Sequence, residues 1–146
     1  MITRRRVLAS LLVTAAVSMT IFAAAPSFAK DPLALTGYDP VSYFYGSAPL
    51  KGKADFTAKH KGLTYRFASA QNRDAFVSEP ARFAPQFDGY CAYGVSRGYK
   101  VGVDPLAYKV VAGKLYLNYS RSVQRTWSRD IPGYIAKANE TWPGIE

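Results

Sequence analysis

The chain has 146 residues and a formal charge of +9, from 19 lysines and arginines against 10 aspartates and glutamates. This length fits a single domain. The sequence holds one cysteine and one histidine. A single cysteine excludes an intrachain disulfide and a Cys-x-x-Cys zinc or redox site, and a single histidine excludes a multi-histidine metal centre.

The first 29 residues have the composition of an export signal. A basic head that contains Arg4–Arg6 precedes an apolar stretch ending at Ala25, and small residues follow at Ser27 and Ala29. This pattern predicts a secretory signal peptide that is cleaved after Ala29 and delivers the protein to the periplasm or the medium. The alternative is a transmembrane anchor, because the apolar stretch is just long enough to span a bilayer.

The run from Thr3 to Leu8 places paired arginines before an apolar residue and a leucine. It resembles a twin-arginine signal, from which it departs at Val7 and Ala9. The general secretion route is the alternative. After cleavage, residues 30–146 keep 16 basic and 10 acidic side chains. The basic residues are scattered, which fits a solvated surface. Because the predicted signal exports the domain and is cleaved, we expect no nucleic-acid partner and no stable membrane anchor.

Residues 30–146 predict one α+β domain without an internal repeat. A short helix is expected after Asp39-Pro40, because aspartate caps helices and proline suits their first turn. Alternating apolar residues on both sides of residues 60–62 predict two strands and a tight turn. Ser69 is then expected to cap a helix over residues 70–78, and Pro80 to begin another turn of helix.

The second part of the domain predicts a similar mixture of elements. A short helix is expected over residues 89–95, and a hairpin around Ala112-Gly113, with Tyr108 and Val110 facing Leu115 and Leu117. Ser120 and Asp130 are expected to cap two further helices, the last over residues 131–141. Short strands and helices in mixed order favour an α+β fold over a regular βαβ alternation.

One motif extends over the middle of the domain and consists of Gly62, Tyr65, Phe67, Ser69, Phe76, Pro80 and Phe83. This motif resembles the YHS domain family, and the run from Asp39 to Val41 is similar to that family's opening Asp-Pro-Val. Residues 89–93 and 113–118 are similar to an exported bacterial branch of the family. The resemblance covers almost all of residues 37–145 and implies a small YHS-like domain over residues 30–146.

Cysteine-bearing members of this family are similar to metal-binding modules. Their thiols follow the Asp-Pro-Val and flank the Phe-x-Ser, at positions that hold Ser42, Ala68 and Asn72 in this chain. The resemblance therefore implies the fold but not this metal site.

Cys91 and His60 are the remaining candidate metal ligands. Cys91 fits a small buried apolar residue, a thiolate ligand, a reactive thiol or an intermolecular disulfide. His60 fits an exposed turn residue among lysines. Together they could hold copper or zinc, with Asp39, Asp104 or Tyr93 completing the ligand set.

Tyrosines gather around the Asp39 and Cys91 motifs. They fit either core packing or an aromatic pocket for a small molecule. The candidate ligand-binding residues are Tyr38, Asp39, Cys91 and Tyr93. The favoured function is an exported, non-enzymatic YHS-type binding module for a metal ion, such as copper or zinc, or for a small ligand. The alternatives are a thiol-dependent enzyme or redox protein that uses Cys91, and a structural or interaction domain without a ligand.

Overall fold

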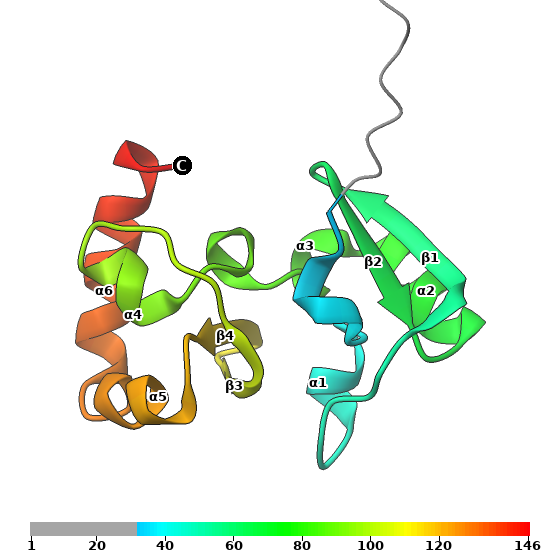
Figure 1. Ribbon diagram of the computed structural model, residues 1–146, viewed down its shortest axis with the longest axis horizontal. Helices are drawn as coiled ribbons and strands as arrows, with labels where there is room; N and C mark the ends of the chain where they lie inside the picture. The colour runs from blue at the N-terminus through cyan, green and yellow to red at the C-terminus, as the bar shows by residue number, and fades with distance from the viewer. Residues whose placement is uncertain (1–31) are drawn as a thin grey trace, which may run out of the picture.

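The computed structural model describes residues 32–146, so the predicted signal peptide lies outside the described residues. The first part of the chain, which we call the first half, forms two short helical turns, a hairpin and two helices (Figure 1). These are η1 (Ala34–Gly37), α1 (Ser42–Tyr45), β1 (Lys53–His60), β2 (Leu63–Phe67), α2 (Ala70–Ser78) and α3 (Pro80–Phe83).

The remainder, the second half, forms a similar set of elements and ends in a longer helix. These are η2 (Gln86–Gly89), α4 (Ala92–Ser96), β3 (Asp104–Val111), β4 (Lys114–Asn118), α5 (Arg121–Trp127), α6 (Ile131–Thr141) and η3 (Trp142–Gly144). Each sheet is a two-stranded antiparallel hairpin. The predicted α+β class is confirmed.

Local sequence signals account for most of the boundaries. The side chains of Ser69, Ser120 and Asp130 each accept a hydrogen bond from the backbone N–H three residues later, which confirms all three predicted caps. Both hairpin turns have two residues with positive φ, and glycine (Gly62 or Gly113) is the second of them. One boundary differs: the helix predicted over residues 89–95 begins at Ala92, after a separate 3-10 turn.

The two halves repeat one structural pattern, so the prediction of no internal repeat was wrong. The two hairpins have the same strand register: adding 51 to the residue numbers of each pair in the first hairpin gives a pair in the second. In each hairpin the strand pairing is interrupted directly after the outermost pair. The outer and inner pairs are Lys53–Phe67 and His60–Leu63 in the first hairpin, and Asp104–Asn118 and Val111–Lys114 in the second.

The turns before the hairpins repeat as well. Both η1 and η2 contain two non-glycine residues with positive φ followed by a glycine, Gly37 or Gly89, that also has positive φ. A tyrosine follows each glycine, and a short helix comes next. In both halves the helix after the hairpin carries a fully buried aromatic residue, Phe76 or Trp127. The fold is therefore a structural duplication.

The hairpin of the second half joins the two halves. β4 is buried on both faces: Leu115 and Leu117 pack in the apolar cluster of the first half, whereas Tyr116 packs in the cluster of the second. Tyr108 pairs with Leu117 and Val110 with Leu115, as the sequence predicts. Figure 1 shows this hairpin between the two groups of helices.

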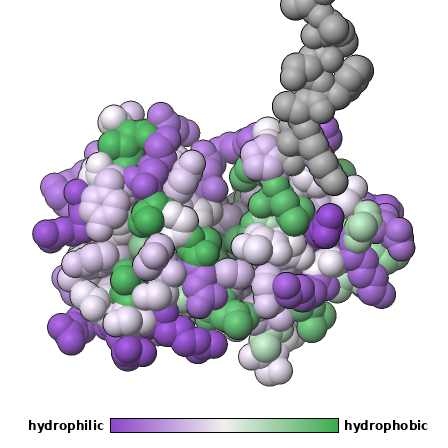
Figure 2. Space-filling model, viewed as in Figure 1, coloured by the Kyte–Doolittle hydropathy of each residue, from purple (hydrophilic) through white to green (hydrophobic). Residues whose placement is uncertain are grey.

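Within residues 32–146, no helix has the length and apolar character needed to cross a bilayer. The face seen in Figure 2 carries scattered apolar residues, and a hollow separates the two halves.

Tyr65 makes stability depend on pH at alkaline values. Burial and, to a smaller extent, the charge of Asp88 raise the pKa of Tyr65 from 10.0 to about 12. Folding therefore favours the protonated phenol, and this contribution is present below pH 10 and lost as pH rises toward 12. We expect the free energy of unfolding to fall by about 2 kcal/mol over that range through Tyr65. In urea unfolding, the free energy of unfolding of Tyr65→Phe should fall less between pH 10 and 12 than that of the wild type. An equal fall in the two proteins would contradict this role of Tyr65.

Candidate ligand-binding site

Asp39 is completely buried, and its carboxylate is occupied by protein donors. Oδ1 accepts from the backbone N–H of Val41 at 2.8 Å. Oδ2 accepts from the backbone N–H of Ala68 at 2.8 Å and from Nδ2 of Asn72 at 2.6 Å. The carboxylate thus ties the start of α1 to the segment between β2 and α2. These bonds fit a structural role better than contact with a ligand, because a buried carboxylate needs such donors to remain in the fold.

The same network occupies the three positions at which the family resemblance places thiols. Ala68 and Asn72 both donate to Oδ2 of Asp39. The hydroxyl of Ser42 donates to the backbone oxygen of Asp39 at 2.7 Å, and its backbone N–H lies 3.4 Å from Oδ1. The three positions therefore lie close together in space, and in this chain all three form hydrogen bonds with Asp39.

Cys91 stands in the second half where Asp39 stands in the first. The backbone N–H of Cys91 donates to the carbonyl of Val101, as that of Asp39 does to the carbonyl of Leu50. The Sγ atom accepts from the backbone N–H of Gly94 at 3.4 Å and of Tyr119 at 3.2 Å.

Ser42 and Ala68 are the counterparts of Gly94 and Tyr119 in the repeat, and their backbone N–H groups serve Asp39. Two equivalent sets of N–H donors thus hold a carboxylate in one half and a sulfur in the other.

Asn118 lies beside the thiol. Its Oδ1 is 3.7 Å from Sγ of Cys91, which donates to it, and it accepts from the backbone N–H of Tyr93 at 3.4 Å. The Asn118 side chain is completely buried, and its Nδ2 has no hydrogen-bond partner among the described residues. The thiol is therefore enclosed by one amide and two backbone donors.

Cys91 lines a cavity of about 230 Å³ at the surface of the second half. The thiol-bearing residue itself is only 1% exposed, whereas Tyr99 and Tyr119 are 50% and 58% exposed and form the rim. The Tyr93 ring packs edge-on against Tyr134, with the centroids 5.2 Å apart. The full lining is Cys91, Tyr93, Tyr99, Val101, Tyr119 and Val123, which we call the Cys91 pocket.

The structure thus brings together two of the four candidate ligand-binding residues. Cys91 and Tyr93 share the Cys91 pocket, but Tyr38 and Asp39 belong to the first half and line none of it. The Tyr38 ring is half-buried against the apolar cluster of that half, and Nζ of Lys51 lies 4.9 Å from its centroid. Sequence reasoning did not find the rim residue Tyr119, which follows β4 directly.

His60 does not join Cys91. It is the last residue of β1 and half-buried, rather than an exposed turn residue. Its ring lies edge-on to Phe76, with the centroids 5.8 Å apart, and 6.4 Å from the Tyr65 centroid. His60 lines a different cavity, at the junction of the halves. Among residues 32–146, no three side chains of histidine, cysteine, aspartate or glutamate form a group suited to a metal ion.

These features define the chain as a duplicated α+β domain in which a buried acceptor organises each half. No family model, curated protein or solved structure matches the chain.

The role of Asp39 can be tested with an isosteric change. Asp39→Asn replaces one carboxylate oxygen with a donor, which would face the N–H groups that now bind it. We expect the free energy of unfolding to fall by about 3 kcal/mol, because at least one buried donor loses its acceptor. The measurement is urea unfolding at neutral pH. Asp55→Asn, at an exposed position of β1, is the matched control and should change stability by less than about 0.5 kcal/mol.

Proposed function

We propose that the mature domain is an exported, non-enzymatic YHS-type binding module that holds a small organic molecule in the Cys91 pocket. The observation that supports this most strongly is the convergence of Cys91 with Tyr93, Tyr99 and Tyr119 around one surface cavity. Aromatic walls with a few polar groups are typical of small-molecule sites. The part of the proposal that concerns export is based on the signal-like residues 1–29.

The lining indicates the size and chemistry of the ligand. The cavity of about 230 Å³ is smaller than sites for drug-sized molecules, which start near ~300 Å³. Val101 and Val123 offer apolar contact, and the tyrosines offer ring faces and hydroxyl groups. A single-ring compound with one polar substituent, such as a phenol, matches this combination.

The surroundings of the sulfur favour an organic ligand over copper or zinc. The two nearest backbone groups, from Gly94 and Tyr119, donate hydrogen bonds to Sγ and therefore cannot serve as metal ligands. Because the chain has a single cysteine, a copper or zinc site at Cys91 would need imidazole or carboxylate ligands as well, and the single histidine, His60, lies in another cavity.

A thiol-dependent enzyme or redox protein is the second candidate. The observation that favours it is the pair of N–H donors on Cys91, because the equivalent donors in the first half hold a carboxylate. These donors and the Asn118 amide fix the position of the sulfur, and a cysteine that acts as a nucleophile needs a fixed position of this kind.

The binding proposal predicts that p-cresol occupies the pocket. In NMR titrations of the mature domain, we expect the amide signals of Tyr119 and Val101 to shift, with a dissociation constant of about 1 mM or tighter. Val123→Phe should fill the pocket and weaken binding by about tenfold or more.

Val77→Phe makes the same change at an exposed position of α2, outside the lining, and should bind p-cresol like the wild type. Equal binding by the two phenylalanine variants, or shifts confined to other regions, would overturn the proposal.

Thiol reactivity separates the two candidates. Cys91 is the only cysteine of the chain, so alkylation by iodoacetamide reports on this residue alone. For a binding module, we expect the folded protein to react at least about tenfold more slowly than the urea-unfolded protein, because Sγ is buried and hydrogen-bonded. Saturating p-cresol should slow it further. A folded protein that reacts faster than the unfolded one would instead support the thiol-dependent candidate; Cys91→Ser gives the background rate.

A further inference from the structure

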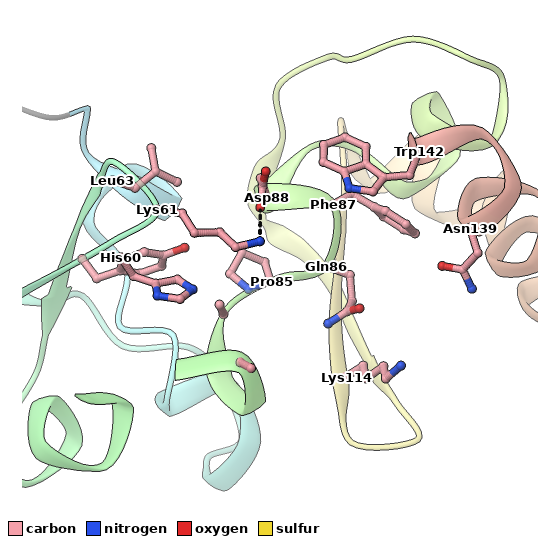
Figure 3. Close-up of a pocket in the computed structure, with 13 residues that line it drawn as sticks. His60, Lys61, Leu63, Pro85, Gln86, Phe87, Asp88, Lys114, Asn139 and Trp142 are labelled. Atoms are coloured by element: carbon pink, nitrogen blue, oxygen red, sulfur yellow. Dashed lines mark hydrogen bonds and ion pairs between the residues drawn. The ribbon is translucent and has the colours of Figure 1, made fainter. Parts of the chain in front are cut away.

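A second cavity, of about 440 Å³, lies at the junction of the two halves and is separate from the Cys91 pocket. Figure 3 shows His60, Lys61 and Leu63 on the β1–β2 side, facing residues of the second half. The opposing side includes Gln86, Lys114, Asn139 and Trp142. We call this cavity the junction cleft. Its volume falls within the range of small-molecule sites, about 300–1,000 Å³.

The charge of the junction cleft is positive. Its ionisable side chains are two lysines, the single histidine, the weakly acidic Tyr65 and one carboxylate, Asp88. That carboxylate already pairs with Lys61, with 3.4 Å between Nζ and Oδ1. Among residues 32–146, the ion pairs of the structure do not include Lys114. A positive charge is therefore available in the cleft without an internal partner.

The cleft also offers hydrogen-bond donors beside apolar walls. The amide side chains of Gln86 and Asn139 form no hydrogen bond with another of the described residues. Both amides are therefore available to hydrogen-bond a ligand in the cleft. Phe87 and Trp142 lie with their ring centroids 5.8 Å apart, and the buried Pro85 lines the same cleft. Cations and amides next to rings match a ligand with an anionic end and a flat apolar body.

We propose that the junction cleft binds a small aromatic carboxylate. Lys61 takes the carboxylate, and Lys114 adds positive charge on the opposite side of the cleft. Gln86 and Asn139 supply hydrogen bonds, and the apolar body contacts Pro85, Phe87 and Trp142. Because the two lysines belong to different halves, the ligand would bridge the structural repeat.

Asp88 competes with such a ligand for Lys61. The side chains of the pair are 61% and 35% exposed, so the pair itself contributes little to stability and can exchange partners. Removing the carboxylate of Asp88 should therefore strengthen binding of an anion. Asparagine suits this position, because Asp88 has a φ of 51° and asparagine adopts positive φ more readily than most residues.

Benzoate is the probe for this site, with the neutral benzamide as its uncharged analogue. In NMR titrations of the mature domain we expect benzoate to shift signals of Gln86, Lys114 and Asn139, and benzamide to bind at least about fivefold more weakly. Lys61→Gln and Lys114→Gln should each weaken benzoate binding about threefold or more, whereas Asp88→Asn should strengthen it about threefold. Raising the salt concentration should weaken benzoate binding but not benzamide binding.

Lys109→Gln is the matched control. Lys109 is an exposed lysine of the β3–β4 hairpin, to which Lys114 also belongs, and it does not line the cleft. It should leave benzoate affinity unchanged. The proposal would be overturned if benzoate and benzamide bound equally, or if all three lysine variants had the same effect on benzoate binding. Weaker benzoate binding by Asp88→Asn would also overturn it. Binding of p-cresol in the Cys91 pocket is an independent result, since the two cavities share no lining residue.

Discussion

Each half of this domain depends on one buried acceptor that follows a Gly-Tyr pair. Asp39 and Cys91 both receive a backbone N–H from the short helix that they precede and another from the segment after the second strand of the hairpin. These bonds hold the end of the hairpin against the start of the short helix. Neither half has a sheet of more than two strands, and such hairpins are only marginally stable alone. The acceptor therefore fixes an arrangement that strand pairing cannot fix.

The two acceptors differ in what surrounds them. The carboxylate of Asp39 satisfies an amide side chain as well as backbone groups, and it lies sealed in the first half. The sulfur of Cys91 is a weaker acceptor, and it forms part of a surface cavity rimmed by tyrosines. The acceptor of the first half is thus enclosed by the protein, whereas the acceptor of the second half lines a surface cavity. The junction between them provides the second cavity, as is common where two structural units meet.

The features that could be predicted from the sequence are those set by neighbouring residues, namely the helix caps and the hairpin turns. The capping side chains of Ser69 and Ser120 and the glycine turns of both hairpins act over three or four residues, and they appear where expected. The duplication was missed because its halves share mainly backbone geometry. Few side chains are identical at equivalent positions; examples are Gly37 and Gly89, Tyr38 and Tyr90, Gly62 and Gly113, Tyr65 and Tyr116, and Ser69 and Ser120. The junction cleft was missed because its residues meet only in three dimensions.

The strand β4 has a consequence for how this fold can be divided. Leu115 and Leu117 belong to the second half by sequence but complete the apolar core of the first. A fragment that ended near Pro85 would expose the core residues of the first half that these leucines cover. The repeat is therefore not two modules joined in series.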